Sequence, residues 1–230
     1  MTEIPTGLDL TPVWLTMRLA GVTVVLLLVL GMPLAWWLAR TRSPFKIPVE
    51  AVTALPLVLP PTVLGFYLLI FLGASGPAGQ LWTRIAGHPL AFSFPGLVIA
   101  SCIYSLPFVV QPLQAAFEVL DRRAVEASFT LGASRTRTFL RVVLPGIRRG
   151  LITAVVLGFA HTLGEFGVVL MVGGNIPGET QVVATAIYEY VEILDYDSAG
   201  VLSAGFLALS FLVLLLVYGA NQRWHRELKL

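Results

Sequence analysis

The chain has 230 residues, of which 57% are apolar and only 12% charged, and its mean hydropathy is +0.84. This composition excludes an ordinary soluble globular domain and predicts an all-α integral membrane protein. A single cysteine, Cys102, excludes an internal disulfide and a cysteine-based metal cluster.

Five apolar segments are long enough to cross about 30 Å of hydrocarbon as helices. They cover residues 14–39, 49–72, 94–119, 150–173 and 198–220. The tail before the first segment carries acids and two prolines where a cleavable signal peptide has a basic region, so we expect that segment to be retained. Residues 1–230 are expected to form a single transmembrane domain.

Positive charge alternates along the chain. The loops at 40–48 and 120–149, together with the C-terminal tail (Arg223, Arg226 and Lys229), hold thirteen of the fifteen Lys and Arg residues, whereas the loop at 174–197 holds none and carries five acids. The positive-inside rule therefore predicts that the basic loops are cytoplasmic, with the N-terminus outside and the C-terminus inside. Basic patches that bind nucleic acid or lipid are an alternative, but topology alone explains the alternation, and no nucleic-acid partner is expected.

The second and third segments are rich in proline. The second contains Pro56, Pro60 and Pro61, and the third contains Pro107 and Pro112. Proline removes a backbone hydrogen bond and bends a spanning helix, so we expect both helices to be bent or locally opened. Structural kinking is the leading interpretation, and a hinge for gating is the alternative.

The loop at 120–149 is the longest polar interval and is predicted to form two short helices. Asp121 is a plausible N-cap for a helix that runs through Leu131 and stops at Gly132. Ser134 can cap a second helix, which Pro145 then limits. The first helix gathers small side chains on one face, which suits it to a cleft on a partner.

The spacing of Glu126-Ala127-Ser128, then Gly132, then Leu144-Pro145 resembles the "EAA" loop of the permease subunits of binding-protein-dependent ABC importers. Ser128 stands where that pattern has a second alanine, a change between small residues that should leave the docking surface intact. The resemblance implies an ATPase-docking site made of Glu126, Ala127, Ser128, Leu131, Gly132, Ala133, Leu144 and Pro145.

The fourth segment carries a stripe of small residues, Gly150, Ala154, Gly158 and Thr162, which allows another helix to approach closely. His161 and Glu165 extend the same flank. An ionisable group there should face protein or a water-filled route. Three interpretations stay open for them: a hydrogen-bonded structural pair, a lining of the translocation route or its gate, and a catalytic or metal site, which lacks a third ligand. Candidate route or gate residues are Pro60, Pro61, His161, Glu165, Gly164 and Gly167.

Two further stretches narrow the resemblance to molybdate permeases. One is residues 55–72 with the preceding LARTRSPFK, and the other is GEFGVVLMVGGNIPGETQ at 164–181. Glycines and a proline in the second stretch predict an irregular outer turn, followed by a short helix at 180–191. That helix is expected at the outer surface, either as part of a gate or binding-protein contact or as a solvated connector.

This resemblance implies a multi-pass subunit of the bacterial or archaeal inner membrane that carries molybdate, with tungstate as a near-isosteric companion. It also implies a second copy of the chain in a homodimer, two ABC ATPase subunits and an external oxyanion-binding protein. The chain has no G-x-x-x-x-G-K-[ST] phosphate loop, so we expect no catalytic residue, metal or cofactor in it, and ATP-Mg only in the partner ATPase.

Three alternatives remain at this stage. A sulfate ABC permease shares the docking loop and the general layout. An ATP-independent ion-coupled transporter could use His161 and Glu165 as a proton relay, although it leaves the docking loop unexplained. An intramembrane enzyme would need a third catalytic partner that the sequence does not place nearby.

Overall fold

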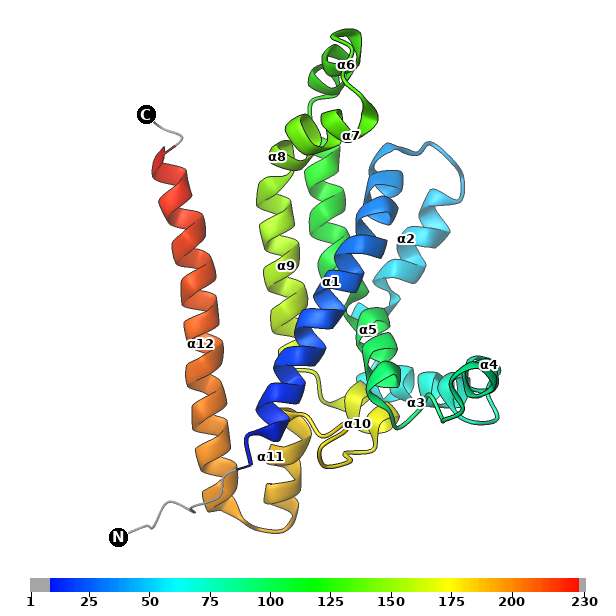
Figure 1. The fold of residues 1–230 in the computed structure, drawn as a ribbon, viewed down its shortest axis with the longest axis vertical. Helices are drawn as coiled ribbons and strands as arrows, with labels where there is room; N and C mark the ends of the chain where they lie inside the picture. Colours follow the sequence, from blue (N-terminus) through cyan, green and yellow to red (C-terminus); the bar gives the residue numbers. More distant parts are fainter. Residues whose placement is uncertain (1–8, 228–230) are drawn as a thin grey trace.

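The computed structural model describes residues 9–227, and every regular element within that range is helical, which confirms the predicted all-α class (Figure 1). The elements are α1 (Thr11–Arg40), α2 (Lys46–Ala54), the 3-10 turn η1 (Leu55–Leu57), α3 (Pro61–Leu72), α4 (Pro77–Ala86), α5 (Phe94–Val119), α6 (Arg122–Thr130), α7 (Arg135–Thr138), the π-helical turn η2 (Phe139–Val143), α8 (Leu144–Gly146), α9 (Arg148–Leu163), α10 (Gly167–Gly173), α11 (Val183–Glu192) and α12 (Tyr196–Glu227).

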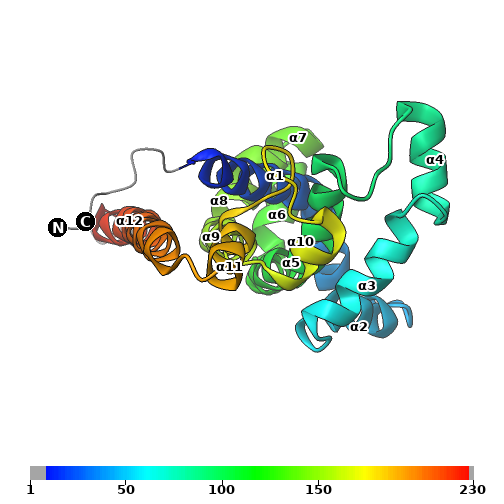
Figure 2. The same cartoon turned by 90° about the horizontal axis from the view of Figure 1, so that it is seen from below.

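Helices α1, α5 and α9 pack together as the centre of the molecule. Helices α6, α7 and α8 lie at one end of this bundle, which we call the docking-loop end, while α4, α10 and α11 lie at the opposite end (Figure 1). Seen along the bundle, α12 stands to one side of it and α4 to the other (Figure 2). Helix α12 packs mainly on α11 and only lightly on α9.

Three predicted spans are single long apolar helices, α1, α5 and α12. The prediction of one helix over 49–72 is wrong only in its continuity, because the chain bends by 110° between Lys46–Leu57 and Pro61–Leu72, and a bend was expected from the prolines. Pro60 adopts an extended conformation (φ −55°, ψ 137°), as the residue before a proline tends to, and Pro61 then begins α3. The prolines therefore break this segment, as the sequence suggested.

The prediction of one helix over 150–173 is also wrong. Helix α9 ends at Leu163, three residues intervene, and α10 begins at Gly167. At 1.5 Å per residue, the 16 residues of α9 span about 24 Å, less than the hydrocarbon thickness. Glycines at 164 and 167 favour the break because glycine is a poor helix former. Helix α5, in contrast, continues through Pro107 and Pro112 without interruption.

The loops that carry most of the positive charge lie at the same end of the structure. Residues 41–45 and the docking loop are together at one end, and the last turns of α12 reach that end as well (Figure 1). The acidic segment between α10 and α12 lies at the other end. Lys229 and residues 1–8, which entered the charge prediction, lie outside the described residues.

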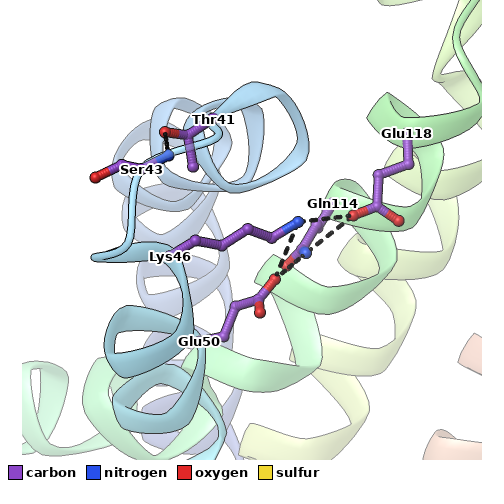
Figure 3. Close-up of polar contacts among 6 residues, drawn as sticks. All are labelled: Thr41, Ser43, Lys46, Glu50, Gln114 and Glu118. Carbon is purple, nitrogen blue, oxygen red and sulfur yellow. Dashed lines mark hydrogen bonds and ion pairs between the residues drawn. The ribbon is translucent and has the colours of Figure 1, made fainter.

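Helix α2 is held to α5 chiefly by polar contacts (Figure 3). Thr53 is the only buried residue of α2. The Lys46 ammonium lies 3.6 Å from the Glu50 carboxylate and 3.8 Å from that of Glu118, and the Gln114 amide donates to both carboxylates at 2.7 and 3.1 Å. This cluster links the first turns of α2 to the last turns of α5.

Candidate functional site

The docking loop, residues 120–149, has the predicted helix caps and the predicted stop at Gly132, but Pro145 does not end the second helix, because α7, η2 and α8 continue through it to Gly146. The Asp121 side chain accepts a hydrogen bond from the Arg123 amide at 2.9 Å and caps α6. Gly132 follows that helix with φ +78°, and the Ser134 hydroxyl accepts from the Arg137 amide at 3.3 Å to cap α7. Local capping thus sets the shape of the loop.

Helix α6 has no buried residue, and two of the eight predicted docking residues, Glu126 and Ala127, lie on its exposed surface. Glu126, Ala127 and Leu131 are exposed, Leu131 to 87%. A large apolar side chain as exposed as that of Leu131, beside the small side chain of Ala127, favours contact with another protein. Leu144 is half-buried and Pro145 exposed at the far end of the loop, and Ala133 is half-buried.

Ser128 differs from its neighbours in the predicted docking set, because its hydroxyl faces the inside of the loop. Ser128 Oγ donates to the Val125 carbonyl at 2.8 Å and lies 2.8 Å from Oγ1 of the buried Thr138. Alanine at this position could not make the second contact, which ties α6 to α7. The serine therefore stiffens the loop while keeping the side chain small.

The loop is anchored in the hydrophobic core at its own end of the bundle. Val143 and Ile147 are buried in the same cluster as Leu120 and Phe117 of the α5 end. A side chain at Gly146 would collide with Leu120. Between Arg135–Gly146 and Arg148–Leu163 the chain bends by 74°. The loop therefore packs directly on the adjoining ends of α5 and α9.

The small-residue stripe of α9 lies against α5 and α1. Ala154, Gly158 and Thr162 are buried. A Cβ on Gly158 would lie 2.6 Å from Val109 Cγ2, and one on Gly150 would lie 2.8 Å from the Pro112 carbonyl oxygen. The predicted close approach of helices along this stripe is therefore confirmed.

The breaks in the second and fourth segments meet in space, which brings two of the candidate gate residues together. A Cβ on Gly167 would lie 2.8 Å from Pro61 Cβ, and one on Gly65 of α3 would lie 2.9 Å from Met171 Cβ of α10. Helices α3 and α10 thus pack side by side across the bundle toward its opposite end (Figure 1). Pro60, Pro61 and Gly164 are exposed beside this contact.

His161 and Glu165 do not bond to each other. His161 Nδ1 lies 2.9 Å from Ser105 Oγ, and the imidazole stacks on Phe108 with ring centroids 3.8 Å apart. The structural pair among the three interpretations is therefore wrong as a direct contact, since His161 instead links α9 to α5. Within residues 9–215, whose side chains the structure describes, no group of three His, Cys, Asp or Glu side chains is placed to hold a metal ion.

Glu165 sits in the break between α9 and α10 and is only 3% exposed. Ser101 of α5 lies beside its carboxyl group, but neither carboxylate oxygen makes a hydrogen bond of good geometry to a described residue. A charged carboxylate in such a place is costly. The Glu165 carboxyl group is therefore either uncharged in this conformation or given hydrogen-bond partners in a different conformation of the protein.

We expect Glu165→Gln to fold and assemble normally and to keep uptake within about twofold, because the amide has the shape of the carboxyl group and no charge to bury. Thermal unfolding of the purified protein and uptake in vesicles measure the two effects. A glutamine variant that assembles but transports nothing would show that the charged carboxylate is needed during the cycle.

Sequence reasoning missed the cluster that joins α2 to α5 at Lys46, Glu50, Gln114 and Glu118. The spacing of Lys46 to Glu50 and of Gln114 to Glu118, four residues each, was visible as two separate helix pairs. Only the fold shows that the two pairs interdigitate across neighbouring helices.

The chain resembles known proteins over nearly its whole length. Residues 31–226 match the family described as "Binding-protein-dependent transport system inner membrane component". The chain is 56% identical to "Molybdenum transport system permease protein ModB" of Azotobacter vinelandii over 93% of its own length and 95% of that protein. It is 36% identical to "Sulfate transport system permease protein CysT" of a Synechocystis species over 86% of its length and 69% of that protein.

Solved structures share the fold at much lower identity. A chain from "Inward facing conformations of the MetNI methionine ABC transporter" superposes with a TM-score of 0.70 at 19% identity, covering 99% of both chains. A chain from the "Crystal structure of bacterial alginate ABC transporter in complex with alginate pentasaccharide-bound periplasmic protein" has a TM-score of 0.74 at 17% identity, over 95% of this chain and 80% of that one.

Proposed function

Because this chain belongs to the family of binding-protein-dependent transport system inner membrane components, we propose that it is the permease subunit of an ATP-driven importer of molybdate. The assignment of molybdate as the substrate rests on the 56% identity with a molybdenum permease over 93% of the chain, compared with 36% identity with a sulfate permease. Tungstate, a near-isosteric oxyanion, is the expected companion substrate.

The complete importer would contain two copies of this chain, two ABC ATPase subunits and an external oxyanion-binding protein. ATP with Mg²⁺ would be bound and hydrolysed by the ATPases alone, and this chain would hold no cofactor. The exposed apolar and small side chains of α6 support a protein partner on that surface. The binding protein would supply most of the selectivity, since the permease needs a route that releases a dianion.

The docking loop would couple the ATPases to the route. Its outward face, with Glu126, Ala127 and Leu131, would sit in a cleft of the ATPase. Val143 and Ile147 would pass movement of the loop to the α5 and α9 ends, because they share one buried cluster with them. Close packing along the α9 stripe would pass this movement along α9 toward the opposite end of the bundle.

The contact between the two breaks is the best candidate for the gate. Pro60 and Pro61 have no amide hydrogen to donate, Gly164 and Gly167 flank the break between α9 and α10, and Glu165 and His161 lie just beside it. A tilt of α9 relative to α5 would separate Gly167 from Pro61 and admit the solute. These residues are proposed to line or gate the route.

We infer that the docking-loop end faces the cytoplasm, as the positive-inside rule predicts. A cysteine at the exposed Glu192, in a Cys102→Ala background, is expected to react with an impermeant reagent only from outside the cell. Asp195 is not used as the probe, because hydrogen bonds from the Ser198 side chain and from the Ser198 amide, the latter at 3.1 Å, lower the pKa of Asp195 at the start of α12. Labelling confined to inverted vesicles would reverse this orientation.

The proposal is tested by reconstituting the chain with its ATPase and binding protein in vesicles and following uptake of molybdate with and without ATP. ATP-dependent molybdate uptake that persists in excess sulfate is the expected result. Uptake of sulfate alone would support the permease function but contradict molybdate as the substrate. Uptake that does not depend on ATP would contradict the proposal of an ATP-driven importer.

A further inference from the structure

Two adjoining hollows lie between α1 and the docking loop. The larger, about 640 Å³, is apolar and runs along α1 from Leu28 to Trp36, with Phe129 and Phe139 of the docking loop on its other wall. The smaller, about 210 Å³, is lined by Trp36, Arg40, Arg122, Val125 and Glu126. Trp36 and Val125 line both, so the two hollows form one apolar groove that opens into a charged cup.

The cup carries positive charge that the protein does not neutralise. Arg40 donates from Nη2 to the Leu120 carbonyl at 3.2 Å and lies over the Trp36 ring, while its buried Nε has no hydrogen-bond partner among the described residues. Arg122 lies close enough for the two like charges to repel. Among residues 9–215, whose side chains the structure describes, no carboxylate forms an ion pair with either arginine, although Glu126 also lines the cup. An anion in the cup would relieve this repulsion.

The position of the hollows in the membrane indicates what occupies them. The groove runs beside the apolar part of α1 and is also lined by Arg135 of the docking loop, and the cup lies where α1 ends and the polar loop begins. Trp36 and Trp37 are partly exposed at this level, where tryptophan commonly marks the membrane interface. A ligand that fits has an apolar tail and an anionic head, placed as in a phospholipid of this leaflet.

We propose that this groove and cup bind an anionic phospholipid, with an acyl chain between α1 and the docking loop and the phosphate group on Arg40 and Arg122. The bound lipid bridges the bundle and the loop that turns toward the ATPase, and it steadies the angle between them. The binding does not depend on which solute the importer carries. Anionic lipids are attracted by such basic clusters at about 1 kcal/mol per arginine near the surface, or roughly fivefold in affinity.

The test uses the delipidated full-length chain in detergent and native mass spectrometry, with phosphatidylglycerol and phosphatidylcholine of identical acyl chains as the probes. Arg122→Gln is expected to weaken phosphatidylglycerol binding about fivefold and to leave phosphatidylcholine unchanged. Arg123→Gln is the matched control, since Arg123 is the exposed neighbour that does not line the cup. Arg40 is left intact because it also contacts Leu120.

The groove is tested separately by filling it. Val29 lines the groove and is 64% exposed, whereas Val25, one turn away on α1, is 60% exposed and does not line it. Val29→Trp is expected to lower binding of both lipids, and Val25→Trp is not.

Equal binding of the two lipids, or equal effects of the paired variants, would overturn the proposal and leave only a general lipid coat. Loss of dimers in Val29→Trp with unchanged lipid binding would identify a second copy of the chain as the occupant instead. Because lipid binding is measured without transport, its failure is distinct from failure of the importer function.

Discussion

Leucine at Gly150 is expected to prevent the folded chain from accumulating. Gly150 faces α5 at the start of the α9 stripe, and a Cβ there would collide with Ala116 and lie 2.8 Å from the Pro112 carbonyl oxygen. A backbone atom cannot move aside as a side-chain tip can. Overpacking a well-packed site costs about 1–3 kcal/mol and occasionally more, and this site joins the docking loop to the bundle.

The measurement is the amount of monodisperse protein recovered from membranes, together with its unfolding temperature in detergent. Gly21→Leu on α1 is the matched control, because Gly21 is also a glycine in a spanning helix and a Cβ there meets nothing within 4 Å. Normal yield and unfolding temperature for Gly150→Leu would mean that α5 and α9 do not approach as closely as this structure has them.

The elements that sequence predicted best are those that local chemistry determines. Asp121, Gly132 and Ser134 act through their own caps and backbone angles, so α6 begins and ends, and α7 begins, as expected. The small-residue stripe on α9 could also be predicted from the sequence. Four small residues spaced four apart on one helix face indicate that another helix packs closely there. The long apolar runs of α1, α5 and α12 also predicted these helices, because each run is long enough to cross the membrane.

The predictions failed where an apolar run contains a bend or a break, because hydropathy does not show it. Hydropathy alone cannot separate a straight span from two short helices, so residues 49–72 and 150–173 were assigned as single helices. Pro60 and Gly164 mark the breaks, but proline in α5 leaves that helix continuous, so the residue type alone does not decide. The bend depends on the partner: Gly167 can rest on Pro61 only because both segments turn at the same level.

The proposed gate shows the same limit. The sequence named Pro61, Gly167, His161 and Glu165 as candidates, and the fold puts Pro61 and Gly167 in contact, but it assigns His161 to Ser105 and Phe108 rather than to Glu165. Helical spacing of four residues predicts a shared face, and it holds only while the helix continues. Because α9 ends at Leu163, Glu165 falls beyond the last residue to which that spacing applies.

Replacing Gly132 with proline is expected to abolish ATP-dependent uptake while leaving the membrane bundle folded. Gly132 has φ +78°, and its amide donates to the Phe129 carbonyl at 2.9 Å. Proline fixes φ near −65° and has no amide hydrogen, so the turn between α6 and α7 must rearrange at a cost of about 3 kcal/mol or more. Helix α6 has no buried residue, so its displacement need not disturb the bundle.

Gly132→Asn is the matched control for this prediction, since asparagine tolerates the left-handed conformation better than most residues and keeps the amide donor. A Cβ at this position meets no atom within 4 Å, so the side chain itself has room. We expect the asparagine variant to capture the ATPase and transport at a level close to the unchanged chain, and the proline variant to lose both while the purified protein remains folded and monodisperse. Retention of ATPase binding and uptake by Gly132→Pro would show that the ATPase does not grip α6, and the coupling route through Val143 and Ile147 would then have to begin elsewhere in the loop.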